Sequence, residues 1–408
     1  MDVGSESPAR VGPVVRPELL CLPFVATTRS DDQVGPDTQP TAPGAERRVC
    51  CENVCVMVPT PDEGEAARRP HRAARMEDAL HRAVEPRLRR RGREVTIVPY
   101  AGYGRSHWVR AMCRVVLSRP EPRRAKDAKV RGWRNFTTVP VRNTRVVIEA
   151  AGRTHETRTD RAGFVDCVLD GGPQSEHAFT PGWSTIRISA EGAESVEALV
   201  RIVSPSVQFG LVSDVDDTVM VTALPRPLLA AWNTFILDEH ARMAVPGMAV
   251  LYERLTNAQP GAPVFYLSTG AWNVAPTLTR FLSRHLYPAG PLLLTNWGPT
   301  KDRWFRNGRE HKRATLARLA EEFPDIRWLL VGDDGQHDEE IYAEFAATYP
   351  EHVAAVAIRH LSPTQSVLAG SIPGPGGDSS AAGPAGRPWL YAPDGAGLWH
   401  LLLQAGIV

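Results

Sequence analysis

The stretch VQFGLVSDVDDTVM at residues 207–220 decides the fold, because it joins an apolar run to three aspartates. The run has the pattern of a buried strand, and Asp214, Asp216 and Asp217 follow at its carboxyl end. Carboxylates at the end of a buried strand cost free energy unless water, a partner or a metal ion compensates their charge. The stretch therefore predicts a ligand at this position.

Four more apolar segments repeat the strand pattern downstream, and amphipathic helical patterns separate them. The strand segments are PVFYLST, PLLLTNW, WLLVGDD and VAAVAIR, and the helical ones are PGMAVLYERLTN, VAPTLTRFLSRHL, HKRATLARLAEEFP and DEEIYAEFAATYP. This alternation is typical of a parallel sheet covered by helices on both faces. We therefore expect an α/β domain with a doubly wound parallel sheet at residues 205–368, and a ligand site at the carboxyl ends of its strands.

The rest of the chain divides into three further regions. Residues 1–75 are rich in Pro, Gly, Asp and Thr without a sustained apolar period, which predicts a disordered extension. Residues 76–204 begin with a basic helical pattern and continue with six β-rich segments, which predicts a smaller antiparallel, β-sandwich-like domain. Residues 369–408 contain the run GSIPGPGGDSSAAGPAG, and we expect a flexible linker and a short C-terminal tail with a final helix, GLWHLLLQAG.

The net charge of +1 conceals a local concentration of positive charge. The segment from Arg68 to Arg134 contains 20 Lys/Arg and 6 Asp/Glu. Such a segment suits an anionic partner, either nucleic acid or a membrane surface, although a solvated arginine-rich face explains it equally well. Since no apolar run approaches the ~20 residues that cross a bilayer, we expect a cytoplasmic protein and leave open peripheral attachment to an anionic membrane.

The expected strand ends carry side chains that suit phosphoryl transfer. These are Asp214, Asp216, Ser268, Asp333 and Asp338, joined by Lys312 at the start of a helical pattern near the same edge. Clustered carboxylates repel one another unless a divalent cation neutralises them, and hard oxygen ligands beside a phosphate select Mg²⁺. One aspartate can then attack phosphorus and a second can protonate the leaving oxygen, while a hydroxyl and an ammonium hold the phosphoryl group.

In this order, the motifs resemble the four motifs of the haloacid-dehalogenase superfamily of aspartate-nucleophile phosphatases. More narrowly, the stretches DVDDTV, FYLSTGAWN, LTNWGPT, RWFRNGREHK and VGDDGQHDEEIY resemble the actin-patch-associated, Mg²⁺-dependent phosphatidate phosphatases and their bacterial relatives. The resemblance implies a haloacid-dehalogenase-like domain that hydrolyses phosphatidate to diacylglycerol and phosphate through an aspartyl phosphate. It implies a phospholipid or another phosphomonoester as substrate and no nucleic-acid partner, and it leaves the oligomeric state open.

The resemblance also implies a role for each candidate residue. Asp214 would be the nucleophile and a metal ligand, Asp216 the general acid and base with a backbone carbonyl on the metal, Ser268 and Lys312 the phosphoryl-binding groups, and Asp333 and Asp338 acidic metal ligands. Thr218 would order the turn, and His311 and His337 would be bystanders.

Two alternative functions remain open from the sequence. The first is a phosphatase of a soluble phosphomonoester. The second is a non-catalytic module that binds a membrane or another anionic partner, and the complete set of candidate catalytic residues argues against it. The segment 219–263 between the first two motifs is too short for a closed lid, which suits a large or lipid substrate.

Overall fold

The computed structural model describes residues 84–119, 138–171, 178–221, 243–295, 301–335, 337–363, 365–366 and 378–408, without the side chains of 301–307. Several of the sequence predictions lie outside these residues. They concern the extension at 1–75, part of the basic segment, residues 222–242 of the insert between the first two motifs and residues 370–377 of the linker. The sequence leaves equally open whether the aromatic and basic residues near Trp304 contact an interface or a phosphate headgroup or are ordinary core and rim residues, and their side chains also lie outside the description: Trp297, Arg303, Trp304, Phe305 and Arg306.

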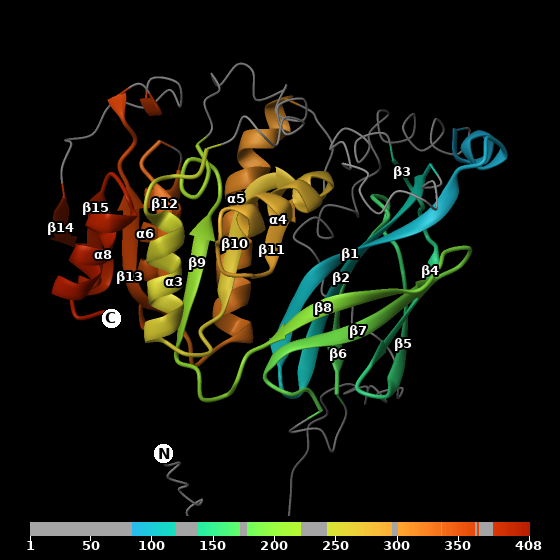
Figure 1. Cartoon of the computed structure of the whole chain (residues 1–408), viewed down its shortest axis with the longest axis horizontal. Coiled ribbons are helices and arrows are strands. Elements are labelled where there is room, and N and C mark those ends of the chain that lie inside the picture. Colours follow the sequence, from blue (N-terminus) through green and yellow to red (C-terminus); the bar gives the residue numbers. More distant parts are fainter. Residues whose placement is uncertain are drawn as a thin grey trace, which may run out of the picture. The chain divides into compact units, whose positions relative to one another are not determined.

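Seven strands form the sheet that carries the aspartates, in the order β11-β10-β9-β12-β13-β15-β14 (Figure 1). Their bounds are β9 Phe209–Asp214, β10 Val264–Ala271, β11 Leu292–Thr295, β12 Arg327–Asp333, β13 Val353–Arg359, β14 Ser379–Ala382 and β15 Pro388–Ala392. Neighbours are parallel except β14 and β15. The five strands predicted from apolar runs are β9 to β13, so the prediction of a parallel sheet is confirmed.

The apolar composition explains why these strands lie inside the sheet. All seven residues of β13 are buried, as are six of the seven in β12. A strand that is covered on both faces needs a nearly uninterrupted apolar run, because a polar side chain on either face would be desolvated. β9 carries the first aspartate motif and lies between β10 and β12.

Helices connect the parallel strands and cover the sheet. They are α3 Met248–Ala258, α4 Ala275–Arg284, α5 Lys301–Glu322, α6 Asp338–Thr348 and α8 Gly395–Gln404, with short 3₁₀ turns at Trp272–Val274, Pro350–His352 and Pro384–Gly386. Figure 1 shows α3 and α8 in front of the sheet and α5 and α6 behind it. α3 illustrates the pattern, because its buried residues Met248, Leu251, Tyr252 and Leu255 follow the helical repeat.

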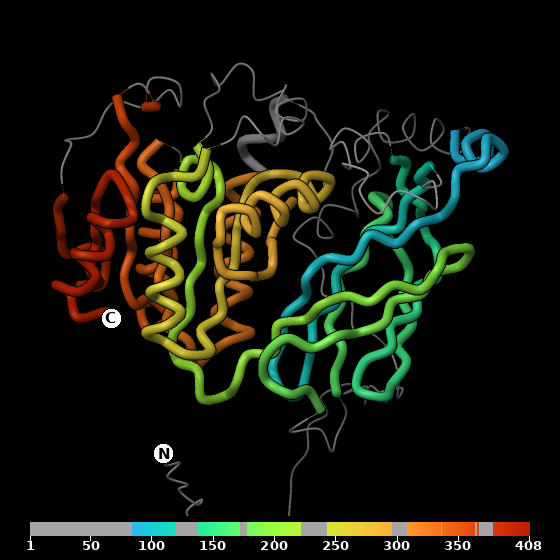
Figure 2. The backbone as a smooth tube through the Cα atoms, viewed as in Figure 1, coloured from blue at the N-terminus to red at the C-terminus, as the bar shows by residue number. Residues whose placement is uncertain are grey.

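Residues 379–392 differ from the flexible linker that the sequence indicated, whereas the final helix that it indicated is present as α8. β15 pairs in parallel with β13, and β14 pairs antiparallel with β15. α8 buries Leu398, Leu401 and Leu402, and Figure 2 shows this red segment returning beside the strands of the sheet. The sequence does not predict this strand, because β15 has only five residues and follows a Gly- and Pro-rich run.

An eight-stranded sheet precedes the parallel one. Its strands are β1 Glu94–Arg105, β2 Trp108–Ser118, β3 Val139–Pro140, β4 Arg145–Ala150, β5 Arg153–Arg158, β6 Phe164–Asp170, β7 Gly182–Ala190 and β8 Val196–Ile202. The order is β3-β2-β1-β8-β7-β4-β5, with β6 on β2, and β1 and β8 are its parallel pair. The β-rich region is thus confirmed and mainly antiparallel, whereas its sandwich-like layering stays a prediction.

Two buried arginines join this sheet to helix α5 and to the turn that follows it. Arg110, which is 1% exposed, donates to Glu322 at 2.6 Å and to Asp166 at 2.5 Å. Arg105 donates to Asp325 at 2.9 Å. Both arginines belong to the basic segment of the sequence, so part of its positive charge is used inside the fold.

Among the described residues, no helix combines the length and the apolar composition that a membrane-spanning helix needs.

Candidate active site

The carboxyl ends of β9, β10 and β12 bring the candidate residues to one edge of the parallel sheet. Leu267 of β10 pairs with Asp214 at the end of β9, and Ser268 follows directly. Asp333 ends β12, and Asp338 begins α6. The six candidates are at most 6% exposed: Asp214, Asp216, Ser268, Lys312, Asp333 and Asp338. This edge of the sheet is therefore a buried polar site.

Lys312 connects two of the carboxylates. Its Nζ donates to Asp214 Oδ1 at 2.7 Å and to Asp338 Oδ1 at 2.5 Å. Burial lowers the pKa of Lys312, but the attraction of these two carboxylates outweighs it and raises the pKa above its ordinary value. The ammonium therefore stays charged and holds both side chains in place.

Helix α5, which carries Lys312, begins earlier in the chain than the sequence indicated. It begins at Lys301, so Lys312 lies in its interior and not at its start. Gly308 lets the helix approach β10 closely, because a Cβ at this position would lie 3.0 Å from Thr269 Cγ2. The helical pattern in the sequence begins only at His311, whereas the helix of the structure also includes Gly308 and the charged residues around it.

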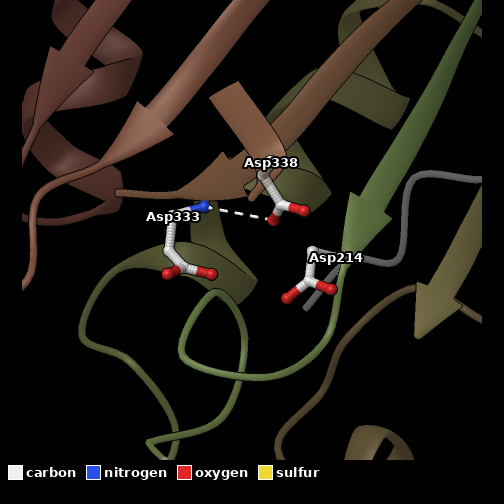
Figure 3. A group of neighbouring side chains, drawn as sticks. All are labelled: Asp214, Asp333 and Asp338. Carbon is white, nitrogen blue, oxygen red and sulfur yellow. Dashed lines mark hydrogen bonds between the residues drawn. The ribbon is translucent and has the colours of Figure 1, made fainter. Parts of the chain in front are cut away.

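Three carboxylates cluster at the same place. Asp214, Asp333 and Asp338 each offer an oxygen atom, and these atoms lie within 4.8 Å of one another. Figure 3 shows the three side chains around a common space, with a hydrogen bond from the Asp333 backbone N to Asp338 Oδ2 at 3.5 Å. Burial raises the pKa of Asp214 and of Asp333 well above the ordinary value, and repulsion from the neighbouring carboxylates adds to both shifts, although Lys312 opposes them. The ionised cluster therefore needs more positive charge than Lys312 supplies.

A divalent cation fits this arrangement. Asp214 Oδ2 is buried and has no hydrogen-bond partner, although its other oxygen is bound by Lys312. Buried polar atoms are nearly always satisfied, so an orphan carboxylate oxygen beside two other carboxylates indicates a ligand. Carboxylate oxygens are also the donors that hard divalent cations prefer.

Asp216 has different surroundings. Its Oδ2 accepts a hydrogen bond from Ser268 Oγ at 3.0 Å, and the backbone N of Gly270 donates to the same hydroxyl at 3.0 Å. Its carboxylate is not among the three that cluster. The role expected from the sequence does not require it there, because only the backbone carbonyl of Asp216 is expected to bind the metal ion. The two aspartates of the first motif thus have separate neighbours, which allows them separate chemical roles.

Gly332 determines where Asp338 can lie. A Cβ at Gly332 would be 2.6 Å from Asp338 Oδ2 and 2.7 Å from Asp338 Cβ. These separations are shorter than van der Waals contact, so only glycine leaves room for this carboxylate beside Asp333. The fourth motif therefore needs a glycine before Asp333 for steric reasons.

Two histidines next to the motifs lie outside the carboxylate group. His311 Nε2 lies 3.4 Å from the carbonyl oxygen of Leu293, and burial lowers its pKa to about 4. His337 is 2.5 Å from Arg309 Nη2 and 3.6 Å from Glu340. Neither belongs to the three-carboxylate cluster, and their role as bystanders stays a prediction.

Sequence reasoning missed Arg359 at the end of β13. Its side chain is buried, and Nη1 donates to the backbone carbonyl of Asp217 at 2.6 Å. Asp217 has a left-handed backbone, with φ of 57°. A signal was present in the sequence, because Arg359 ends the apolar strand VAAVAIR and so lies at the same edge as the aspartates.

Comparison with known proteins identifies relatives of part of the chain. Residues 209–360 match the family model for the catalytic domain of phosphatidate phosphatase APP1. Phosphatidate phosphatase APP1 of Saccharomyces cerevisiae is 25% identical over 240 residues, which are 57% of this chain and 40% of that protein. An uncharacterized protein of Schizosaccharomyces pombe is 27% identical over 150 residues, which are 36% of this chain and 24% of that protein. The chain thus spans less than half the length of either relative.

Solved structures are more distant. A carbohydrate acetylesterase from Xanthomonas citri aligns with 76% of this chain and 74% of its own at 11% identity, with a TM-score of 0.26. Another carbohydrate esterase aligns with 77% of this chain and 96% of its own at 11% identity, with a TM-score of 0.23. Neither similarity is high enough to support an argument about fold or function.

Proposed function

We propose that this chain, whose residues 209–360 belong to the family of the phosphatidate phosphatase APP1 catalytic domain, hydrolyses a phosphomonoester through Asp214. The observation that carries the proposal is the buried group in which Lys312 joins Asp214 and Asp338 beside Asp333. A carboxylate with one oxygen held by a cation and the other without a hydrogen-bond partner is suited to attack an electrophilic phosphorus.

Phosphatidate is the substrate that the family supports best. Both the family and the Saccharomyces cerevisiae relative are named for phosphatidate phosphatase. On this proposal the reaction releases diacylglycerol and inorganic phosphate. We propose peripheral attachment to an anionic membrane as the way in which the chain reaches such a substrate.

The proposed fold of the catalytic domain is of the haloacid-dehalogenase type. Parallel strands in the order β11-β10-β9-β12-β13, with helices in front of the sheet and behind it, support this assignment. The proposed nucleophile ends the middle one of these five strands. Sheets of this kind bind ligands at the carboxyl ends of their strands, where the order of the connections reverses.

Mg²⁺ is the cation that we propose for the carboxylate cluster. Asp214, Asp333 and Asp338 would hold it together with the backbone carbonyl of Asp216. When bound, the ion neutralises the carboxylates and withdraws charge from the phosphoryl group. Lys312 is already bonded to two of these carboxylates, so it supplies the remaining positive charge.

In the proposed mechanism, an oxygen of Asp214 attacks phosphorus and the bond from phosphorus to the substrate alcohol breaks. The carboxyl group of Asp216 gives its proton to the departing alkoxide, so a neutral alcohol leaves and Asp214 carries the phosphoryl group as an aspartyl phosphate. Asp216, now ionised, takes a proton from water as that water attacks the same phosphorus. Phosphate leaves and Asp214 is regenerated, while Ser268 and Lys312 hold the phosphoryl oxygens throughout.

The test is a phosphate-release assay with the purified chain. Phosphatidate in mixed micelles is compared with soluble phosphomonoesters, each with Mg²⁺ and with excess chelator. We expect release from phosphatidate with Mg²⁺, loss of release in chelator, and loss of release in Asp214→Asn. Preference for a soluble ester would replace the proposed substrate, and full activity of Asp214→Asn would exclude the proposed mechanism.

A further inference from the structure

The guanidinium of Arg359 joins three separate parts of the chain at the edge of the catalytic sheet. Nη1 donates to the backbone carbonyl of Asp217 at 2.6 Å, Nη2 donates to Gln365 Oε1 at 2.8 Å, and Nε donates to the carbonyl of Pro393 at 3.2 Å. The residue is 5% exposed. A buried arginine with a fixed acceptor on each of its three nitrogen atoms is held rigidly, so it can hold the groups that it binds.

The group on Nη1 belongs to the turn that follows the proposed nucleophile. Asp217 has φ of 57°, a left-handed conformation that is unfavourable for a residue with a side chain. The turn is closed by hydrogen bonds from Val219 N to Val215 O at 3.1 Å and from Asp217 N to Met220 O at 2.8 Å. Asp216, the proposed acid and base, lies inside this turn. A shift of the Asp217 carbonyl would therefore move Asp216 relative to Asp214.

A second path connects the same turn to the C-terminal segment. The backbone N of Val245 donates to the carbonyl of Val219 at 3.1 Å, and the backbone N of Gly395 donates to the carbonyl of Pro246 at 3.1 Å. Gly395 packs directly on Gly247, since a Cβ on Gly395 would lie 2.3 Å from both the carbonyl carbon and oxygen of Gly247. The start of α8 therefore supports the turn through residues 245–247, independently of Arg359.

We propose that Arg359 is a positioning residue, which together with residues 388–404 fixes the turn after Asp214 so that Asp216 is aligned for proton transfer. The catalytic unit then extends beyond the family match at 209–360 and includes β15 and the start of α8. Arg359 acts through the backbone of Asp217 and does not touch the reacting atoms. The kinetic consequence rests on the proposed function, whereas the structural consequence does not.

The kinetic test compares Arg359→Gln and Arg359→Lys with the wild type in the phosphate-release assay. Since small misplacements of catalytic groups cost up to about 100-fold in rate, we expect kcat of Arg359→Gln to fall by about 10- to 100-fold. KM should change little, because the phosphoryl-binding groups are untouched. Lysine keeps the charge and can reach one acceptor, so Arg359→Lys should lose less activity.

The chain offers a matched control in Arg201. This arginine also donates to a backbone carbonyl of a distant segment, that of Gly261 at 3.1 Å, but Gly261 lies before β10 at the opposite end of that strand from Ser268. Arg201→Gln should leave kcat and KM unchanged. Equal losses in Arg201→Gln and Arg359→Gln would overturn the inference, because any broken arginine-to-carbonyl bond would then have the same effect.

Hydrogen exchange tests the inference without any substrate. We expect the backbone amides of 215–221 to exchange about tenfold faster in Arg359→Gln than in the wild type, while those of β12 change little. Unchanged exchange at 215–221, or faster exchange to the same degree throughout the domain, would show that Arg359 does not position this turn. If the exchange result is as expected but the wild type releases no phosphate, the proposed function fails and the positioning role stands.

Discussion

Replacing Lys312 by Met removes a side-chain cation that bonds to two members of the carboxylate cluster, and it keeps most of the apolar stem. Asp214 and Asp338 accept from Lys312 at 2.7 Å and 2.5 Å, and all three side chains are at most 3% exposed. Removing one partner from a buried ion pair costs about 3–5 kcal/mol, because it leaves a buried charge uncompensated. At about 2–4 °C per kcal/mol for a domain of this size, the melting temperature should fall by about 6–20 °C.

The loss should depend on pH. Burial raises the folded-state pKa of Asp214 above the ordinary value of 3.8, and Lys312 opposes the shift, so the variant should raise this pKa further. A carboxyl group with a raised folded-state pKa stabilises the protein fully below its ordinary pKa, and that stability is lost as the pH rises through the folded-state value. The deficit of Lys312→Met should therefore be larger at about pH 8 than at about pH 5.

The assay is thermal unfolding in chelator and with saturating Mg²⁺, and Arg313→Met is the control. Arg313 is the next residue of α5, is 38% exposed and pairs with Glu344, so its replacement should cost at most about 1 kcal/mol. Mg²⁺ at about 100 times its dissociation constant should return up to about 2.7 kcal/mol to Lys312→Met if the weakened site still binds it. A melting temperature for Lys312→Met in chelator that equals that of Arg313→Met would refute the reasoning.

Three further predictions concern the proton donor, the glycine and the basic segment. Asp216→Asn removes proton delivery, which contributes about 10²–10⁴ in rate, so turnover of phosphatidate should fall. A nitrophenyl phosphate should still give a burst of nitrophenol, because its leaving group needs no proton. Equal losses on both substrates would contradict the assigned role. Gly332→Ala introduces a Cβ 2.6 Å from Asp338 Oδ2, so the free energy of unfolding, measured by chemical denaturation, should fall by about 1–3 kcal/mol. Calorimetry should also show weaker Mg²⁺ binding. A variant with unchanged stability and unchanged Mg²⁺ affinity would contradict the steric account. Deleting residues 68–93 should reduce the fraction of the chain that sediments with anionic vesicles, because each basic residue near such a surface contributes about 1 kcal/mol of binding free energy. The reduction should be clearest at low salt, where charges are screened least. Binding that survives the deletion would place the membrane contact elsewhere.

The part of the fold that could be predicted is the part with long apolar strands. β9, β10, β12 and β13 are buried on both faces, so their sequences are nearly continuous apolar runs and their order along the chain matches a parallel sheet. β15 could not be predicted in the same way. It is five residues long, it pairs with a strand on the other side of a Gly- and Pro-rich run, and its place in the sheet depends on tertiary contacts that no local pattern records.

The site shows the same division between local pattern and tertiary contact. Strand ends at Asp214, Ser268 and Asp333 predicted a shared edge, because parallel strands align their carboxyl ends. The sequence could not show that Lys312 bridges Asp214 and Asp338, since this depends on where α5 begins and on its rotation about its axis. It likewise could not show that Arg359 contacts the backbone of Asp217, because backbone acceptors leave no mark in a sequence.

The support that β15 and α8 give to the turn after Asp214 has a consequence for the timing of synthesis. Translation produces the turn first and the supporting residues Pro393 and Gly395 much later. A nascent chain that has reached His360 already contains all six candidate residues, yet it lacks the carbonyl that fixes Arg359 and the glycine that packs on Gly247. Maturation of the active site would then await the return of β15 to the sheet, so a chain that stalls before this point would have the complete chemistry of the site without its alignment.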